Sequence, residues 1–232
     1  MLRGDYGEGE TVPRRLGSYN WCHVRPLLTQ EDDDLEAVAL ADLHPTQMAV
    51  GMRAVAAKRK KIERHSSSVR KLRRYIERRP VPAVIGPGER FFILDHHHLS
   101  LALWQSAVDE VLVRIVCDLS DMPKRRFFDA MASLGWLHAY DANGRKTCAT
   151  RLPRSLDALQ PDCFRDLAWS VREAGGFYKT SVPFSEFVWA NFFREHIEAA
   201  ALACDFGAAR RRAMALARSP DAQHLPGYAG RC

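Results

Sequence analysis

The sequence predicts an α+β protein, with a small mixed sheet and helices in its first half and a mainly α-helical second half packed against it. Two apolar runs rich in β-branched or aromatic residues, at 83–94 and 110–119, are typical of strands, and the turn GPGE interrupts the first. Apolar residues at helical spacing lie between these runs. After Asp121 the strand-like runs give way to amphipathic helical pieces, so the second half is expected to be helical.

Three regions follow from these changes in pattern. Residues 1–20 form a Gly-rich arm, residues 21–120 carry the mixed sheet, and residues 121–232 form a helical extension. No low-complexity linker separates the last two regions, so we expect them to pack together. A chain of 232 residues is long enough to bury a substantial core.

The first half is expected to contain, in order, a strand candidate at 21–27, an apolar stretch at 37–43, helices at 46–65 and 69–79, a hairpin at 83–94, a helix at 96–107 and a strand at 110–119. Pro45 breaks the element before it, and Thr46 is expected to be the N-cap of the first helix. Pro80 and Pro82 end the second helix.

The second half is expected to contain a helix at 122–137, a turn at 141–146, helical pieces at 155–175, a long helix at 182–204 and a basic helical piece at 208–219. Pro183 suits the first turn of the long helix. The apolar residues of that helix are predicted to be core residues, namely Phe184, Phe187, Val188, Phe192 and Ile197. Core or half-buried packing is also expected for Trp104, Trp136, Trp169 and Trp189.

Composition argues against a membrane-spanning or secreted protein and against a disulfide-rich or zinc-ribbon protein. No apolar run reaches the roughly 18–20 residues of a membrane span, and the N-terminus lacks the apolar stretch of a signal peptide. We therefore expect a cytoplasmic protein with no membrane partner. The six cysteines lie far apart and form no C-x-x-C pair, which predicts free, structural thiols rather than disulfides or a zinc ribbon.

Positive charge is concentrated in one block. The chain has a net charge of +6, but residues 58–79 hold eleven Lys or Arg residues against Glu63 and Glu77, a net charge of +9. Such a block can attract nucleic acid or another phosphate-rich partner. A solvated helix face is the equal alternative.

Three consecutive histidines follow Asp95, where an apolar strand gives way to a helix. Asp95 is expected to be the helix N-cap, which places His96, His97 and His98 in the first turn. Unpaired backbone N–H groups and the helix dipole favour an anion there, and phosphate is the first candidate. Adjacent helical residues point about 100° apart, which disfavours a metal site without removing it. A polar junction with no ligand is the third alternative.

These residues carry a resemblance to a known family. The pattern Asp-x-His-His between a strand and a helix resembles the phosphate-binding signature of the ParB/sulfiredoxin superfamily, and most of all its putative ParB-like nuclease branch with a D-H-H-H type motif. Further similar segments are LHPTQMAVGMRAVAAKRKKI at 43–62, FRDLAWSVREAGGFYKT at 164–180 and FSEFVWANFFR at 184–194. The resemblance covers the chain from about residue 22 onward and implies a ParB/sulfiredoxin-like fold.

The resemblance also implies a site. Members of the superfamily hydrolyse a nucleoside triphosphate, activate a sulfinic acid with ATP or phosphorylate serine, with nucleotide phosphate at this helix start. By this resemblance the candidate catalytic residues are Asp95, His97 and His98. The candidate phosphate- or nucleotide-binding residues are Thr46, Gln47, Gly51, Lys58, Lys61, His96 and Lys179. If a nucleotide is the ligand, Mg²⁺ is the cofactor to expect, with Asp95 as the carboxylate beside it.

The sequence departs from the signature in two places. His96 stands where the signature usually has Gly, and Leu99 stands where an Arg often follows the histidines. The missing Arg removes a bidentate phosphate ligand, which Lys58 or Lys61 is expected to replace. The sulfiredoxin cysteine and a DNA-reading helix-turn-helix are not recognisable, so sulfinic-acid repair and partition-type DNA reading are not expected.

Three hypotheses therefore follow. The first is an enzyme that hydrolyses or transfers a phosphate ester or anhydride, as a nuclease, an NTPase or a small-molecule kinase. The second is a non-catalytic module that binds a nucleotide or DNA on the basic helices at 58–79. The third is the polar junction. Substrate, metal dependence and oligomeric state do not follow from the sequence.

Overall fold

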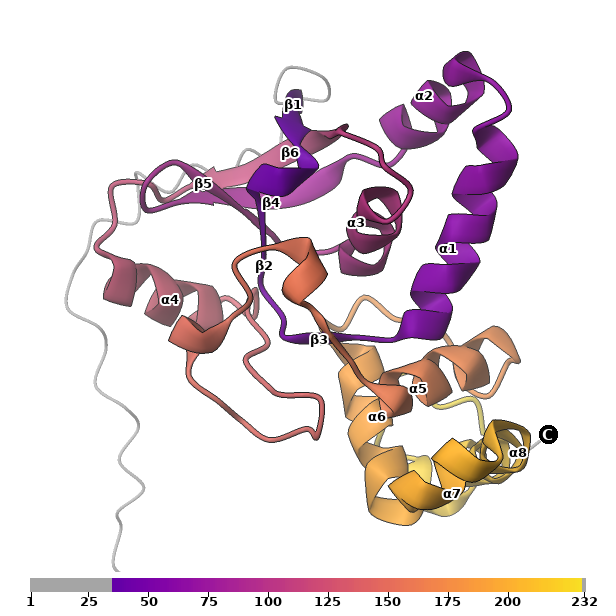
Figure 1. Ribbon diagram of the computed structural model, residues 1–232. Helices are drawn as coiled ribbons and strands as arrows, with labels where there is room; N and C mark the ends of the chain where they lie inside the picture. Colours follow the sequence, from indigo (N-terminus) through magenta and orange to yellow (C-terminus); the bar gives the residue numbers. More distant parts are fainter. Residues whose placement is uncertain (1–34, 231–232) are drawn as a thin grey trace, which may run out of the picture.

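The computed structural model describes residues 35–230 of the chain (Figure 1). The expected arm at 1–20 and the strand candidate at 21–27 lie outside the described residues. Within them the chain forms an α+β fold, which confirms the predicted fold class. The predicted boundaries between the regions stay a prediction.

A five-stranded mixed sheet forms the centre of the first half. Its strands are β1 (Leu35–Ala39), β2 (Leu43–Pro45), β4 (Val81–Gly86), β5 (Arg90–Ile93) and β6 (Glu110–Asp118), in the order β1-β6-β4-β5-β2. Strands β4 and β5 form the predicted antiparallel hairpin, and Gly88 and Glu89 have positive φ angles of 75° and 56° in its turn. The pairs β4–β6 and β2–β5 are parallel.

Helices cover both faces of this sheet. A cluster of buried apolar residues joins one face to α1 (Met52–His65), α2 (Val69–Glu77) and α3 (His97–Trp104). A second cluster, which contains Phe127 and Met131, joins the other face to α4 (Lys124–Ser133). The strands divide between the two clusters by alternation, because successive side chains point to opposite faces: Ile93 enters the first cluster and Phe92 the second.

The second half is helical and has its own buried cluster. Its helices are α5 (Cys163–Glu173), α6 (Ser185–His196), α7 (Ala199–Cys204) and α8 (Phe206–Ala217). Trp189 is fully buried there, stacks on Phe177 with ring centroids 4.2 Å apart, and donates a hydrogen bond from Nε1 to the Pro226 carbonyl. Short 3₁₀ turns occur at Leu40–Asp42, Ala149–Arg151, Leu156–Ala158 and Pro220–Ala222.

A small parallel pair of strands connects the two halves. Strand β3 (Ala49–Val50) pairs with β7 (Gln160–Pro161), and the Asp162 N–H donates to the Val50 carbonyl over 2.9 Å. This pairing places the beginning of α1 beside the beginning of α5 (Figure 1). This contact joins residues that are distant in sequence, and it holds the first turns of α1 and α5 next to each other.

The predicted N-cap at Thr46 is wrong. Residues 43–50 are extended in β2 and β3, and α1 begins at Met52 after Gly51. The first turn of α1 is instead capped from α5, because the Asp166 carboxylate accepts a hydrogen bond of 2.6 Å from the Arg53 N–H. Asp166, which is distant in sequence, therefore caps the helix in place of the neighbouring Thr46.

The predicted N-cap at Asp95 is also wrong. His96 occupies the position before α3 in a left-handed conformation, with φ 65° and ψ 17°. The Asp95 carboxylate accepts a hydrogen bond of 2.6 Å from the adjacent His96 N–H rather than from the N–H groups of the first turn.

The predicted long helix at 182–204 is divided in two. Ile197 is extended, with φ −133° and ψ 127°, and separates α6 from α7, and its side chain is buried in the core. Helix α6 begins after Phe184, so Pro183 lies outside its first turn. Among the residues predicted to be core, Val188 is 39% exposed and Trp104 is exposed as well.

Two composition-based expectations can be compared with the described residues. Cys117, Cys148, Cys163 and Cys204 are free thiols. No helix between residues 35 and 230 is long and apolar enough to cross a membrane. The cytoplasmic location stays a prediction.

Candidate functional site

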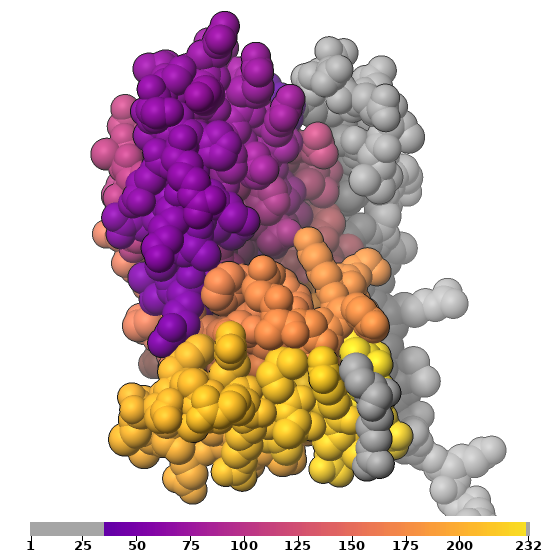
Figure 2. Space-filling view, turned by 90° about the vertical axis from the view of Figure 1, so that its right-hand side faces the viewer, coloured from indigo at the N-terminus to yellow at the C-terminus, as the bar shows by residue number. Residues whose placement is uncertain are grey.

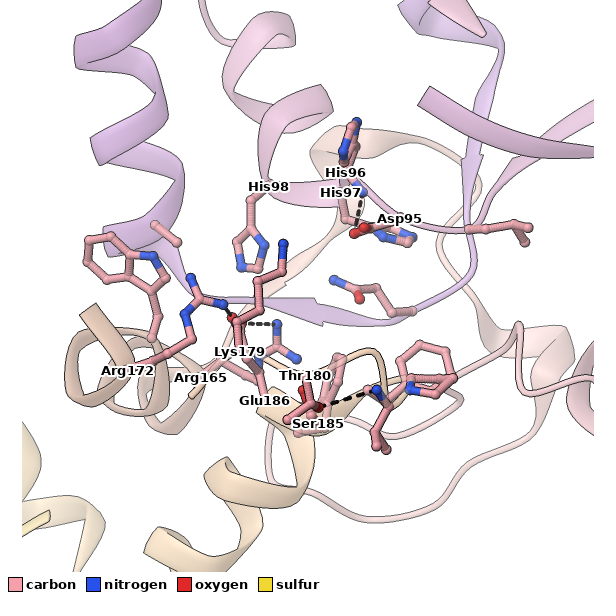
Figure 3. A pocket seen from close by; sticks show the side chains of 18 of the residues that line it. Asp95, His96, His97, His98, Arg165, Arg172, Lys179, Thr180, Ser185 and Glu186 are labelled. Atoms are coloured by element: carbon pink, nitrogen blue, oxygen red, sulfur yellow. Dashed lines mark hydrogen bonds and ion pairs between the residues drawn. The ribbon is translucent and has the colours of Figure 1, made fainter. Parts of the chain in front are cut away.

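A cavity of about 560 Å³ lies between the two halves of the protein. Its walls come from residues 94–98 at the start of α3, from Gln47 and Lys58, and from residues between 165 and 187. Figure 2 shows the hollow between the purple residues of α1 and the orange residues of the second half. Figure 3 shows the side chains that point into it.

The chain reaches the cavity through a sharp turn after β5. His96 adopts the left-handed conformation and α3 begins directly afterwards. This conformation costs a non-glycine residue about 1–2 kcal/mol, whereas glycine, the usual signature residue here, adopts it freely. His96 therefore takes up a conformation that is unfavourable for its residue type, directly before α3.

Backbone N–H groups hold two of the histidines. The Thr46 N–H donates to His97 Nε2 over 3.1 Å, and the Gly51 N–H donates to His98 Nε2 over 3.1 Å. Because Nε2 accepts in both rings, each neutral imidazole carries its proton on Nδ1. Burial lowers the pKa of His97 to about 3 and the pKa of His98 well below its usual value. Both rings are therefore neutral hydrogen-bond donors near pH 7.

Two of the predicted phosphate-binding residues support these histidines and do not line the cavity. Thr46 is fully buried, and its hydroxyl donates a hydrogen bond of 2.6 Å to the Ile93 carbonyl. Gly51 has no room for a side chain, since an added Cβ would lie 2.8 Å from Asp166 Oδ1. Their observed contacts fix the positions of His97 and His98.

The predicted lysines divide into two groups. Lys58 and Lys179 line the cavity, and so does the buried Gln47. Burial lowers the pKa of Lys58, and the neighbouring positive charge of Lys61 lowers it further. Lys61 itself is exposed and is not among the residues of the cavity wall.

His96 lines the cavity but points away from the other two rings, as Figure 3 shows. Burial lowers the pKa of His96, while Asp95 and a backbone hydrogen bond to Arg79 raise it. Between residues 35 and 230 no group of three or more His, Cys, Asp or Glu side chains is arranged to hold a metal ion.

The second half adds three charged residues that the sequence reasoning missed. Arg165 and Arg172 lie seven residues apart on α5, and Glu186 lies near the start of α6. The Arg165 Nη2 donates to Glu186 Oε2 over 3.2 Å, and Arg172 Nη1 contacts Glu186 Oε1. The signal available in the sequence was two arginines at a two-turn spacing in an amphipathic helix.

Arg165 is the most buried cation of the cavity. It is 4% exposed, its guanidinium lies 3.6 Å from the centroid of the Phe187 ring, and its Nε has no hydrogen-bond partner in the described structure. Burial lowers the pKa of Arg165 to about 10, so the group is still charged at pH 7. The N-cap Asp162 fixes the start of α5 by accepting hydrogen bonds from the Phe164 and Arg165 N–H groups.

The charges of the wall favour an anion. Four cationic side chains, Lys58, Arg165, Arg172 and Lys179, face the two carboxylates Asp95 and Glu186. Glu186 is engaged by both arginines, whereas Asp95 is exposed. The neutral imidazoles add donors without adding charge. The cavity therefore offers a cationic, donor-rich surface with one accessible carboxylate.

Comparison with known proteins shows similarity to one protein family and to a solved structure. Residues 36–195 match the model of a protein family described as putative ParB-like nuclease. The crystal structure of protein Atu1540 from Agrobacterium tumefaciens is similar with a TM-score of 0.77 and 38% sequence identity, over 85% of this chain and 99% of that chain. No curated protein matches the sequence.

Proposed function

The chain belongs to the putative ParB-like nuclease family, and from this premise we propose that its cavity binds a phosphate group of a nucleotide or nucleic acid and breaks or transfers the phosphate bond. One observation carries the proposal. The Asp95–His98 signature opens onto the same cavity as Arg165 and Arg172, which come from the other half of the protein.

Phosphate binding would use donors from both walls. The Nδ1–H groups of His97 and His98 are the donors left by their backbone contacts. The guanidinium groups of Arg165 and Arg172 supply the planar, charged donors that the signature loses at Leu99. The arginines of α5 therefore take the role that the sequence reasoning gave to Lys58 or Lys61.

The proposed chemistry is displacement at phosphorus. A water or substrate hydroxyl attacks the phosphorus atom, the bond to the leaving oxygen breaks, and the proton of the nucleophile passes to Asp95. Lys58, Arg165 and Arg172 stabilise the negative charge that develops on the phosphate oxygens. His97 and His98 hold these oxygens and do not act as bases, since Nε2 of each ring already accepts a backbone N–H.

The cavity also fits a nucleotide bound with Mg²⁺. This ion is usually held by one or two protein carboxylates together with substrate phosphates, and it neutralises phosphate charge. Asp95 is the exposed carboxylate of the wall and would provide that contact.

The test is an incubation with nucleoside triphosphates and, separately, with a single-stranded oligonucleotide, each with Mg²⁺, in which free phosphate and strand cleavage are measured. We expect Asp95→Asn and Lys58→Ala to lower turnover about 100-fold, because each removes a group that acts on the developing charge or proton. Lys60→Ala is the matched control, since Lys60 is exposed on the same helix and is not part of the cavity wall.

A second candidate function is a binding module without turnover, which would hold a nucleotide or DNA on the basic helices at 58–79. The exposed positive charge of α1 and α2 favours it. Saturable binding with no released phosphate and no cleavage would establish the module. If the protein bound neither ligand, and His97→Ala changed only the free energy of unfolding, the histidines would form a polar junction with a structural role alone.

A further inference from the structure

A second cavity, of about 350 Å³, lies on the outer side of α2. It is lined by His65, Arg70, Lys71, Arg74, Tyr75, Arg78 and Arg79. Tyr75 is buried, its ring centroid lies 4.6 Å from that of His65, and the Arg79 guanidinium lies 4.0 Å from it. Five of the seven lining residues are Arg or Lys, so an anion is the ligand that this cavity favours.

Two arginines of α2 and the arginine directly after it form a regular row. Arg70, Arg74 and Arg78 recur every four residues, which places them on one side of the helix about 6 Å apart along its axis. Arg73 pairs with Glu77 over 2.7 Å on the same helix. The one carboxylate of α2 is thus engaged outside the row, and the row presents repeated positive charge.

The row leads to the first cavity. Arg79 lines the second cavity, and its backbone raises the pKa of the His96 ring, which lines the first. The charge of Arg79 also lowers the pKa of Lys58 in the first cavity. Figure 2 shows the purple surface of α1 and α2 directly above the hollow. Arg79 is therefore the residue of the second cavity whose charge and backbone act on Lys58 and His96 of the first.

We propose that the row Arg70–Arg74–Arg78 and its cavity bind the phosphodiester backbone of a single nucleic-acid strand whose end enters the first cavity. Regularly spaced cations match a ligand with regularly spaced phosphates, which a free nucleotide does not provide. A cavity of about 560 Å³ is of the size that holds a small ligand, and it admits a strand end rather than a duplex. The inference rests on the proposed function and names its substrate class.

The test measures binding of a fluorescently labelled single-stranded oligonucleotide to the full chain by anisotropy over a range of salt concentrations. The triple variant Arg70→Gln, Arg74→Gln, Arg78→Gln should bind at least about tenfold more weakly. It should also reduce the slope of log affinity against log salt by about 2, since each phosphate contact on a single strand contributes about 0.7. The three positions are exposed, so the variant should keep its fold, which circular dichroism checks.

The matched control removes the same charge elsewhere. The variant Arg210→Gln, Arg211→Gln, Arg212→Gln changes three exposed arginines on α8, and it should leave strand affinity within about twofold. An equal loss in both variants would show an effect of net charge alone and would overturn the inference.

Three further arms separate the possible outcomes. The row variant should still release phosphate from a free nucleoside triphosphate, while Lys58→Ala should lose this turnover and keep most of the strand affinity. If the row variant no longer released phosphate from the free nucleoside triphosphate, the inference would be contradicted. If the wild type itself showed no turnover, only the proposed function would be contradicted. Tighter binding of a duplex than of the single strand, or binding of anionic phospholipid vesicles in place of strands, would overturn the assignment to a single strand.

Discussion

The two walls of the first cavity are built by different physical means. In the wall that carries the signature, backbone N–H groups hold two neutral histidine rings in place. The Thr46 N–H donates to His97, and the Gly51 N–H donates to His98. The wall from the second half is held by charged side chains, with Arg165 and Arg172 on either side of Glu186. The first wall therefore supplies fixed donors, and the second supplies the charge that an anion needs.

Removing the central cation of the charged wall should have the largest effect. Arg165→Ala leaves Glu186 without its buried partner and removes the contact with the Phe187 ring. Breaking a buried ion pair costs about 3–5 kcal/mol, and we expect the lower end, about 3 kcal/mol, because Arg172 still pairs with Glu186. Urea unfolding measures this loss.

The control for that prediction changes an exposed ion pair on α2, away from the charged wall. Arg73→Ala removes the pair with Glu77 and should cost less than about 1 kcal/mol, because both partners are in contact with solvent. If both variants lost a similar free energy of unfolding, the buried ion pair of the charged wall would be no more stabilising than an exposed pair.

The signature wall should respond to a change in packing. In Gly51→Ala the new Cβ would lie 2.8 Å from Asp166 Oδ1 and 3.1 Å from the Arg165 carbonyl carbon, so α1 and α5 must move apart. Overpacking of this kind costs about 1–3 kcal/mol, and it should weaken the hydrogen bond from the residue 51 N–H to His98. Thermal unfolding and the imidazole NMR signals of His98 report the two effects.

Gly207→Ala is the matched control. Gly207 lies in the first turn of α8, where the nearest atom to an added Cβ is Asp205 Oδ1, 3.2 Å away, and alanine is a better helix former than glycine. Stability should be unchanged or slightly higher. An equal loss at both glycines would contradict the close approach of α1 and α5.

Local pattern was enough to predict some elements around the first cavity and not others. The hairpin and the two basic helices follow from residues adjacent in sequence, such as Pro80, whereas the left-handed turn at His96 does not. The cap of α1 comes from Asp166, more than a hundred residues away, which no local pattern contains. For the same reason local pattern predicts a cap at Thr46 and does not predict the arginines of α5 as part of the site. Pairing of β3 with β7 brings these distant groups together.

Asp166 connects the two walls and should make stability depend on pH. Burial raises its pKa from 3.8 to about 6, although the Arg53 N–H and its positive charge lower it. The folded state therefore binds a proton more tightly than the unfolded state does. The stabilisation from protonation is fully present below pH 3.8 and is lost as pH rises through about 6.

Asp166→Asn removes this titration and keeps an oxygen that can accept from the Arg53 N–H. Between pH 4 and pH 7 the wild type should lose about 1 kcal/mol relative to the variant, after allowance for the partial exposure of Asp166. Urea unfolding of both proteins across this range gives the difference directly. A constant difference, or one of opposite sign, would show that Asp166 is not held at a raised pKa.

The smallest effect is expected for the pH dependence of anion binding at the signature wall. Because burial holds the pKa of His97 at about 3 and that of His98 well below its usual value, neither ring gains a proton between pH 5.5 and 7.5. Sulfate is the suitable probe, since its charge is constant over this range. Its affinity, measured by calorimetry, should change by less than about threefold. A tenfold increase towards pH 5.5, about 1.4 kcal/mol, would mean that a histidine of the cavity becomes charged. If the increase remained in His96→Gln, His97 or His98 would be that ring rather than a neutral donor.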